Sequence, residues 1–191
     1  MIEYLKGNID SITPTNLIIE VQGIGYSANI SLNTYTKLQH QKECKLYIYE
    51  LIREDAYILY GFVEPAEREI FTKLISVSGI GGNTARTILS TFTPQELFEA
   101  ISAGDVEQIK RVKGIGLKTA QRVIVDLKGK LQLATTEESA APTIATREEA
   151  ISALTMLGFN PSASQKIVTI ILKEDATLKV EQVIKSALKR L

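Results

Sequence analysis

Residues 77–88 read Val77-Ser78-Gly79-Ile80-Gly81-Gly82-Asn83-Thr84-Ala85-Arg86-Thr87-Ile88, and the pattern returns 35 residues later as Val112-Lys113-Gly114-Ile115-Gly116-Leu117-Lys118-Thr119-Ala120-Gln121-Arg122-Val123. Such a period indicates a duplicated supersecondary unit. Amphipathic runs flank the glycines in both copies, which predicts helix, tight Gly-Ile-Gly hairpin, helix. The two glycines permit positive φ and close backbone approach, and the isoleucine between them can point inward. The second helix then begins with unpaired N–H groups that suit a phosphate.

Two other interpretations compete with this one. A dinucleotide-binding fingerprint needs a strand before the loop and a third glycine, but the preceding run has a helical period and the third position is Thr84 or Thr119. A helical corner that only packs is the other alternative. Two copies in a basic segment favour a pair of phosphate-binding helix–hairpin–helix elements instead.

The charge is distributed unevenly although it sums to zero over the 191 residues. Residues 1–64 hold 5 Lys/Arg and 8 Asp/Glu, residues 65–132 hold 10 and 7, and residues 133–191 hold 7 and 7. The positive segment therefore carries the repeat, as expected of a nucleic-acid-binding segment. Seven basic residues surround the second copy: Lys110, Arg111, Lys113, Lys118, Arg122, Lys128 and Lys130.

The hairpins are predicted to bind the DNA backbone without sequence preference, because backbone donors carry no base information. The predicted backbone-binding residues are Gly79, Gly81, Gly82, Asn83, Lys113, Gly114, Gly116, Leu117, Lys118, Thr119, Arg122 and Lys128. Asn83 stands where the second copy has Lys118, so the first hairpin is expected to rely on its main chain. For Lys128 and Lys130 the alternative role is compensation of charge at a helix C-terminus.

The rest of the chain divides by composition. Five or six short β-rich runs in residues 1–64 predict a small OB-like barrel, with Leu32–Leu38 as a helical connection. Residues 65–132 read as helical, with Thr93 and Asp105 as helix caps. Residues 133–146 predict a flexible linker, and residues 147–191 a three-helix domain starting at Glu148.

Catalytic, metal and cofactor sites are not predicted. The single Cys44 rules out an internal disulfide, and one Cys and one His (His40) leave too few ligands for a structural zinc site. The single His also removes most acid–base schemes, and the chain lacks a phosphate loop. Without a signal peptide or a transmembrane-length apolar run, a cytoplasmic protein is expected. A helix–hairpin–helix nuclease or glycosylase and a generic duplex-binding adaptor stay open as alternatives. Glu54 and Asp55, between the last two β runs, read as a solvated turn on residues alone.

The chain resembles the RuvA family, the Holliday-junction-binding subunits of bacterial RuvAB branch-migration complexes. Besides both hairpins, the resemblance rests on Met1-Ile2 with Gly7 and on residues 21–26, 53–62, 122–128 and 153–159. It implies a homotetramer, or two tetramers that sandwich an open four-way junction, acting in recombination, DNA repair and the SOS response. It makes Glu54 and Asp55 an acidic pin at the crossover.

The resemblance also implies partners. The C-terminal domain would contact RuvB, a hexameric ATPase motor that uses ATP and Mg²⁺, and the resolvase RuvC is a further expected partner. This chain would then be a non-catalytic subunit of the helicase complex. The implied motor contacts are Leu154, Leu157, Phe159 and Leu188, with the domain's own core as the alternative for each, Leu157 in particular. A linker of about 14 residues would span about 20 Å.

Overall fold

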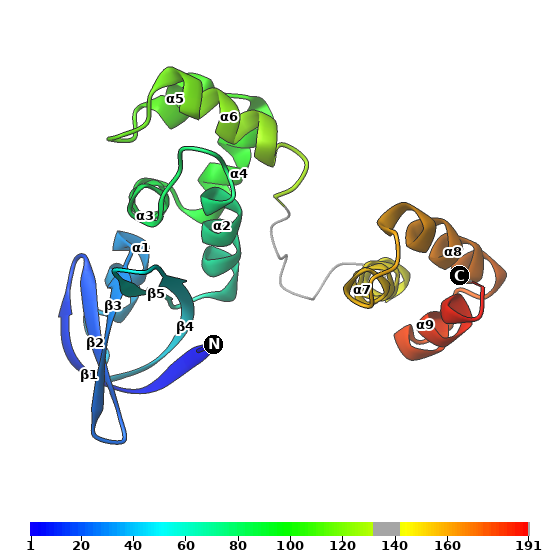
Figure 1. Cartoon of the computed structure of the whole chain (residues 1–191), viewed down its shortest axis with the longest axis horizontal. Coiled ribbons are helices and arrows are strands. Elements are labelled where there is room, and N and C mark those ends of the chain that lie inside the picture. Colours follow the sequence, from blue (N-terminus) through cyan, green and yellow to red (C-terminus); the bar gives the residue numbers. More distant parts are fainter. Residues whose placement is uncertain (132–141, 191) are drawn as a thin grey trace. The chain divides into compact units, whose positions relative to one another are not determined.

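The computed structural model describes residues 1–131 and 142–190, so the predicted linker lies outside the described residues up to position 141. The chain forms two compact units, Met1–Leu133 and Ala134–Leu191, and each is described by itself. The first unit contains a β-barrel and a layer of helices (Figure 1).

The barrel is closed, with its strands in the order β1-β2-β3-β5-β4. The elements are β1 (Tyr4–Thr13), β2 (Asn16–Val21), β3 (Ile24–Ile30), α1 (Leu32–Leu38), β4 (Glu43–Ile52) and β5 (Tyr57–Phe62). Leu17, Ile19 and Leu46 fill its interior and are fully buried. The predicted barrel and its helical connection are thus confirmed. Strand β1 continues past Ile9 to Thr13, with a shift in register between Ile9 and Ser11 in its pairing with β2.

Five helices complete the first unit: α2 (Pro65–Ile75), α3 (Gly82–Thr91), α4 (Pro94–Ala103), α5 (Val106–Lys110) and α6 (Leu117–Leu127). The two predicted caps are confirmed, since Thr93 forms a full capping box with Glu96 and Asp105 accepts from the Gln108 N–H. Helix α6 ends at Leu127, and Gly129 follows with a φ of +77°.

One aromatic side chain of α2 packs against three aromatic rings of the barrel. Phe71 of α2 is fully buried, and its ring centroid lies 5.3 Å from that of Tyr49, 4.8 Å from Tyr60 and 5.0 Å from Phe62. Tyr60 and Phe62 belong to the same core cluster as the helices. Aromatic pairs at such spacings add stabilisation beyond their buried area. The barrel and the helical layer therefore form one body.

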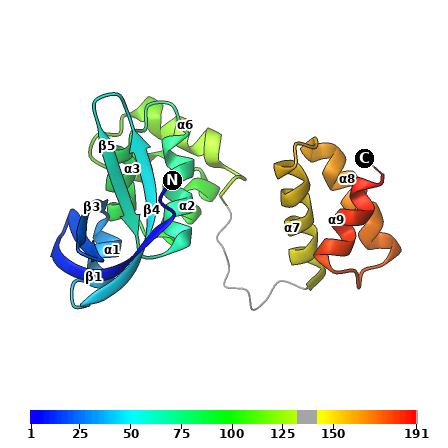
Figure 2. The same cartoon turned by 60° about the horizontal axis from the view of Figure 1, so that its bottom comes forward.

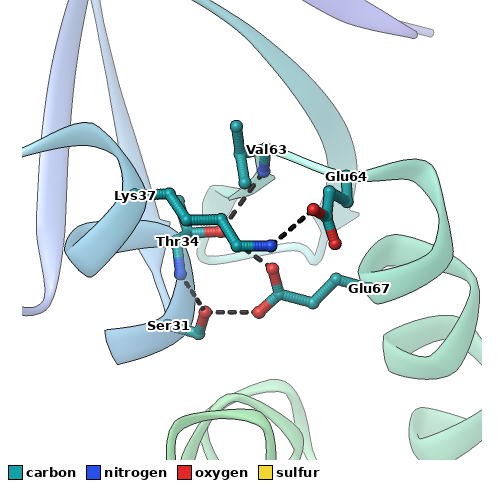
Figure 3. A network of polar contacts seen from close by, with 6 residues as sticks. All are labelled: Ser31, Thr34, Lys37, Val63, Glu64 and Glu67. Atoms are coloured by element: carbon teal, nitrogen blue, oxygen red, sulfur yellow. Dashed lines mark hydrogen bonds and ion pairs between the residues drawn. The ribbon is translucent and has the colours of Figure 1, made fainter. Parts of the chain in front are cut away.

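A buried carboxylate makes the second connection between them. Glu67 in the first turn of α2 accepts hydrogen bonds from the hydroxyls of Ser31 and, at 2.9 Å, Thr34, both at the start of α1 (Figure 3). The Val63 N–H donates in turn to the Thr34 hydroxyl at 3.2 Å. Burial raises the pKa of Glu67, while the two hydroxyl hydrogen bonds act in the opposite direction. These hydrogen bonds of Glu67 thus fix the position of α2 relative to α1 and the barrel.

The raised pKa of Glu67 should make the free energy of unfolding depend on pH. Since its pKa is higher in the folded than in the unfolded protein, its contribution to stability is greatest below the unfolded pKa. It declines as pH rises through the folded pKa. The free energy of unfolding of the native protein should therefore fall relative to Glu67→Gln over this window, measured by urea unfolding at several pH values.

The matched variant Glu67→Ala tests the hydrogen bonds separately. It leaves the buried Ser31 and Thr34 hydroxyls without their acceptor, and should cost about 1–3 kcal/mol. A difference between the native protein and Glu67→Gln that stays constant with pH would contradict the raised pKa.

Over its described residues, 142–190, the second unit contains three helices, α7 (Pro142–Met156), α8 (Pro161–Glu174) and α9 (Val180–Leu188), seen in Figure 2. Their core holds Ala150, Leu154, Val168, Ile171 and Val183. The three-helix prediction is confirmed, but its boundaries shift. Helix α7 begins at Pro142, inside the range predicted as linker and ahead of Glu148, with proline at a first-turn position it suits. Helix α9 follows Lys179, its N-cap, and ends at Leu188.

Candidate nucleic-acid interface

The two Gly-Ile-Gly turns have nearly the same geometry. The Ile80 N–H donates to the Val77 carbonyl at 3.0 Å, and the matching Ile115 N–H donates to the Val112 carbonyl at 3.1 Å. Gly79 and Gly114 have φ values of +93° and +91°, a region that L side chains rarely adopt. Ile80 and Ile115 are both buried, so the predicted hairpin with an inward isoleucine is confirmed in both copies.

The second glycine of each turn does not have the positive φ that the sequence allowed for both glycines. Gly81 and Gly116 are helix N-caps with φ values of −94° and −85°, so neither needs positive φ. A Cβ at either position would meet nothing within 4 Å. Neither helix has a side-chain cap, which leaves the first N–H groups of α3 and α6 without a side-chain acceptor. These glycines therefore keep the positive helix ends open to an approaching anion.

The copies diverge at the next position. Gly82 is buried, and a Cβ there would lie 2.4 Å from the hydroxyl oxygen of Tyr60 on β5. The matching Leu117 is exposed. Glycine at position 82 is therefore required by the barrel, in addition to any role toward a phosphate. The Tyr60 hydroxyl also donates to the exposed Asn83 at 3.4 Å, and burial raises the pKa of Tyr60.

The second hairpin gathers the positive charge. Lys113, Lys118 and Arg122 are exposed around its turn, and among the residues that the structure describes none of them forms an ion pair. Lys110 pairs with Glu107 at 3.2 Å. Thr119, in the first turn of α6, is half-buried. The arrangement offers three uncompensated cations beside an open helix N-terminus.

Lys128 does not belong to this group. It is the C-cap of α6, about 16 Å along the helix from the hairpin. Its ammonium lies 4.0 Å from the position of a Cβ on Gly104, which ends α4. A cation there stabilises the negative end of α4, so this geometry favours the helix-terminus alternative for Lys128.

The barrel holds the first hairpin's helix at further points that the sequence did not reveal. The Asn33 amide on α1 donates to the carbonyls of Leu89 and Phe92 at 2.6 and 2.9 Å, at the C-terminus of α3. Arg86 donates to the Thr15 carbonyl, in the turn between β1 and β2, at 2.8 Å. Together with the contact of Tyr60 at Gly82 and Asn83, these bonds fix α3 relative to the barrel at its N-terminus, its middle and its C-terminus.

Glu54 and Asp55 form the tip of the β4–β5 hairpin. The Arg53 and Ala56 backbones close the turn with hydrogen bonds of 2.8 and 3.4 Å, and both carboxylates are exposed. The strand that leaves this tip, β5, carries Tyr60, which packs on Gly82. The acidic tip and the first Gly-Ile-Gly turn are therefore linked through one strand of a closed barrel.

The predicted motor-contact residues separate into core and surface. Leu154 is 0% exposed and lies in the core of the second unit, so it offers no surface to a partner and its assignment as a contact is corrected. Leu157 and Leu188 are 61% and 43% exposed, and Phe159 is partly buried against the core. Met156, 87% exposed beside Leu157, was not predicted.

Across 1–131 and 142–190, no group of three or more His, Cys, Asp or Glu side chains is placed to hold a metal ion. Within the same ranges no helix has the length and apolar character needed to cross a membrane.

Family models match the chain in three segments. Residues 1–61 match the RuvA N terminal domain, residues 71–129 the SAM-like helix-hairpin-helix tandem, and residues 145–191 the RuvA C-terminal domain. The chain is 56% identical over 201 residues to the Holliday junction branch migration complex subunit RuvA of Bacteroides thetaiotaomicron, and 54% identical over 202 residues to that of Porphyromonas gingivalis. It is 45% identical over 193 residues to the corresponding subunit of Flavobacterium psychrophilum, and each comparison covers the whole of both chains. The chain therefore belongs to the RuvA family.

Proposed function

We propose that this chain binds four-way DNA junctions through their phosphates, holds them open, and recruits a RuvB-type ATPase motor for branch migration in recombination and repair. The observation that carries the proposal is that two hairpins of the same turn geometry lie in one body with an acidic tip. The helix that follows each hairpin has no side-chain cap at its N-terminus. Two open helix N-termini suit two phosphates, and the relatives' name supports a junction as the DNA.

A competition gel shift tests this function. The full chain is titrated against a labelled four-way junction and a linear duplex of equal length and composition, at a stated salt concentration. We expect tighter binding to the junction and no dependence on its sequence, because the donors are backbone N–H groups and cations. Equal affinity for both DNAs would leave only a duplex-binding adaptor.

The acidic tip supplies the junction preference in this proposal. Glu54 and Asp55 project two exposed charges that repel phosphates within about 10 Å, the Debye length at 0.1 M salt. Held at a crossover, they would discourage a folded junction and favour separation of strands. Their fixed connection to the first hairpin sets where the repulsion acts relative to the bound phosphates.

The variant Glu54→Ala/Asp55→Ala isolates this contribution. Junction affinity should stay equal or rise, because a repulsive term is removed, while the rate of motor-driven branch migration should change. Both properties are compared with Glu43→Ala, which removes an exposed carboxylate at the other end of β4. Unchanged migration in the tip variant would contradict a pin role.

Self-association is part of the proposal, as one homotetramer or as two on opposite faces of the junction. Support comes from an open groove of about 880 Å³ between the N-terminus, β4 and α2, lined in part by Met1, Leu51 and Ile52. Ile52 is 71% exposed at the base of the acidic tip. Exposed apolar side chains that lie together, as Met1 and Ile52 do along this groove, are typical of interaction sites. Light scattering of the free and junction-bound protein distinguishes monomer, tetramer and octamer.

The remaining partners follow from the same proposal. The motor would dock on the second unit through Leu157, Leu188 and the adjoining Phe159, and would itself use ATP and Mg²⁺. A RuvC-type resolvase would act on the junction that this chain holds open. We place the protein in the cytoplasm with its DNA.

A further inference from the structure

A hydrogen bond joins the helix of the second hairpin to the loop of the first. Arg122, on the helix of the second hairpin, donates from Nη1 to the Ser78 hydroxyl in the loop of the first at 3.3 Å. Beside this contact, a Cβ on Gly79 would lie 3.8 Å from the Thr119 hydroxyl. The loop of the first hairpin therefore reaches the N-terminal turn of α6, where the second is proposed to hold a phosphate.

The duplication does not explain this contact, because the matching positions of the two copies do not repeat it. The positions that match Ser78 and Arg122 in the opposite copies are Lys113 and Thr87. The Thr87 hydroxyl donates to the Asn83 carbonyl of its own helix at 2.9 Å. Among the described residues no hydrogen bond joins Thr87 to Lys113. The chain thus makes this cross-connection once, to the basic hairpin.

A serine is suited to orienting an arginine that must also bind an anion. A carboxylate partner would neutralise the guanidinium, whereas a hydroxyl occupies one of its five N–H donors and leaves the charge intact. A long exposed side chain loses rotamer freedom when it binds, and a prior contact lowers that loss. Arg122 and Ser78 are both exposed, so the contact is not needed for the core.

We propose that Ser78 is a positioning residue that holds Arg122 beside the open N-terminus of α6, so that guanidinium and backbone N–H groups act on the same phosphate. The inference rests on the proposed DNA binding and extends it. It couples the hairpins, because the loop of one orients the cation of the other.

A double-mutant cycle tests the coupling on the full chain. Ser78→Ala should weaken binding to a four-way junction about three- to tenfold, the range expected for one lost hydrogen bond. In the Arg122→Gln background the same change should have no effect. Ser78→Thr keeps the hydroxyl and should retain the affinity. The matched control is Ser76→Ala in the same loop, because the exposed Ser76 hydroxyl donates to the Lys73 carbonyl and not to Arg122.

Either of two results would overturn the proposal. Equal weakening in both backgrounds would mean that Ser78 contacts DNA by itself, and no weakening in either would remove its role. The same cycle is also measured on linear duplex. If the protein had no preference for a junction, the coupling between Ser78 and Arg122 could still be measured there, so the two proposals can fail separately.

A second measurement needs no DNA. In the free protein, ¹⁵N relaxation of the Arg122 Nε–Hε group should show faster motion in Ser78→Ala, while Arg111 stays unchanged. Identical Arg122 relaxation in both proteins would equally refute positioning.

Discussion

Reversing two charges on the second hairpin, Lys118→Glu with Arg122→Glu, should nearly abolish junction binding. Both side chains are exposed beside an uncapped helix end and unpaired within the described residues. Each charge-assisted hydrogen bond contributes about 1.5–3 kcal/mol, so losing two predicts about 10²–10⁴-fold weaker binding. The slope of log affinity against log salt should become shallower by about 1.8 if each cation neutralises one phosphate.

The control for this pair is Lys185→Glu with Lys189→Glu. These lysines are also four residues apart, exposed and at the end of a helix, but they belong to the second unit. The two variants change net charge equally. We expect the control to bind the junction within about twofold of the native protein, as surface substitutions away from a site usually do. Equal loss in both variants would assign the effect to the overall field instead of the hairpin.

The features that sequence predicted well are those encoded by near neighbours. The turns at Gly79 and Gly114, the capping box at Thr93 and the β-rich runs of the barrel all depend on residues a few positions apart. Hydrophobic period, turn glycines and cap residues act locally, so a single sequence contains them. The same holds for the unequal charge of the two hairpins.

The features that could not be predicted from the sequence depend on contacts between residues that are distant in the chain. Gly82 resembled one more backbone donor, and only the packing of Tyr60 gives it a structural role. Nothing near Glu67 in the sequence indicates that its carboxylate accepts hydrogen bonds from two hydroxyls at the start of α1. Leu154 and Leu157 are both apolar in one amphipathic run, and only the packing of α7, α8 and α9 buries the first and exposes the second. Tertiary contacts decide such cases.

Removing the second unit should separate DNA binding from motor stimulation. Truncation before residue 134 keeps the whole of the first compact unit and avoids cutting through α7, which a deletion from residue 147 would do. Because the barrel, both hairpins and the acidic tip remain, junction affinity should stay within about twofold. Stimulation of the motor's ATPase and branch migration should be lost, measured with purified motor on a movable junction.

A point variant in the intact chain shows whether a surface causes this loss. Leu157→Asp with Leu188→Asp changes two exposed side chains and should abolish stimulation while the thermal midpoint of the second unit is kept. Leu154→Ala instead empties a core site, and should destabilise that unit by about 2–5 kcal/mol. If the motor is stimulated normally by the truncated protein, the second unit is not its docking site. If only Leu154→Ala impairs stimulation, the unit's fold matters but the exposed leucines do not contact the motor.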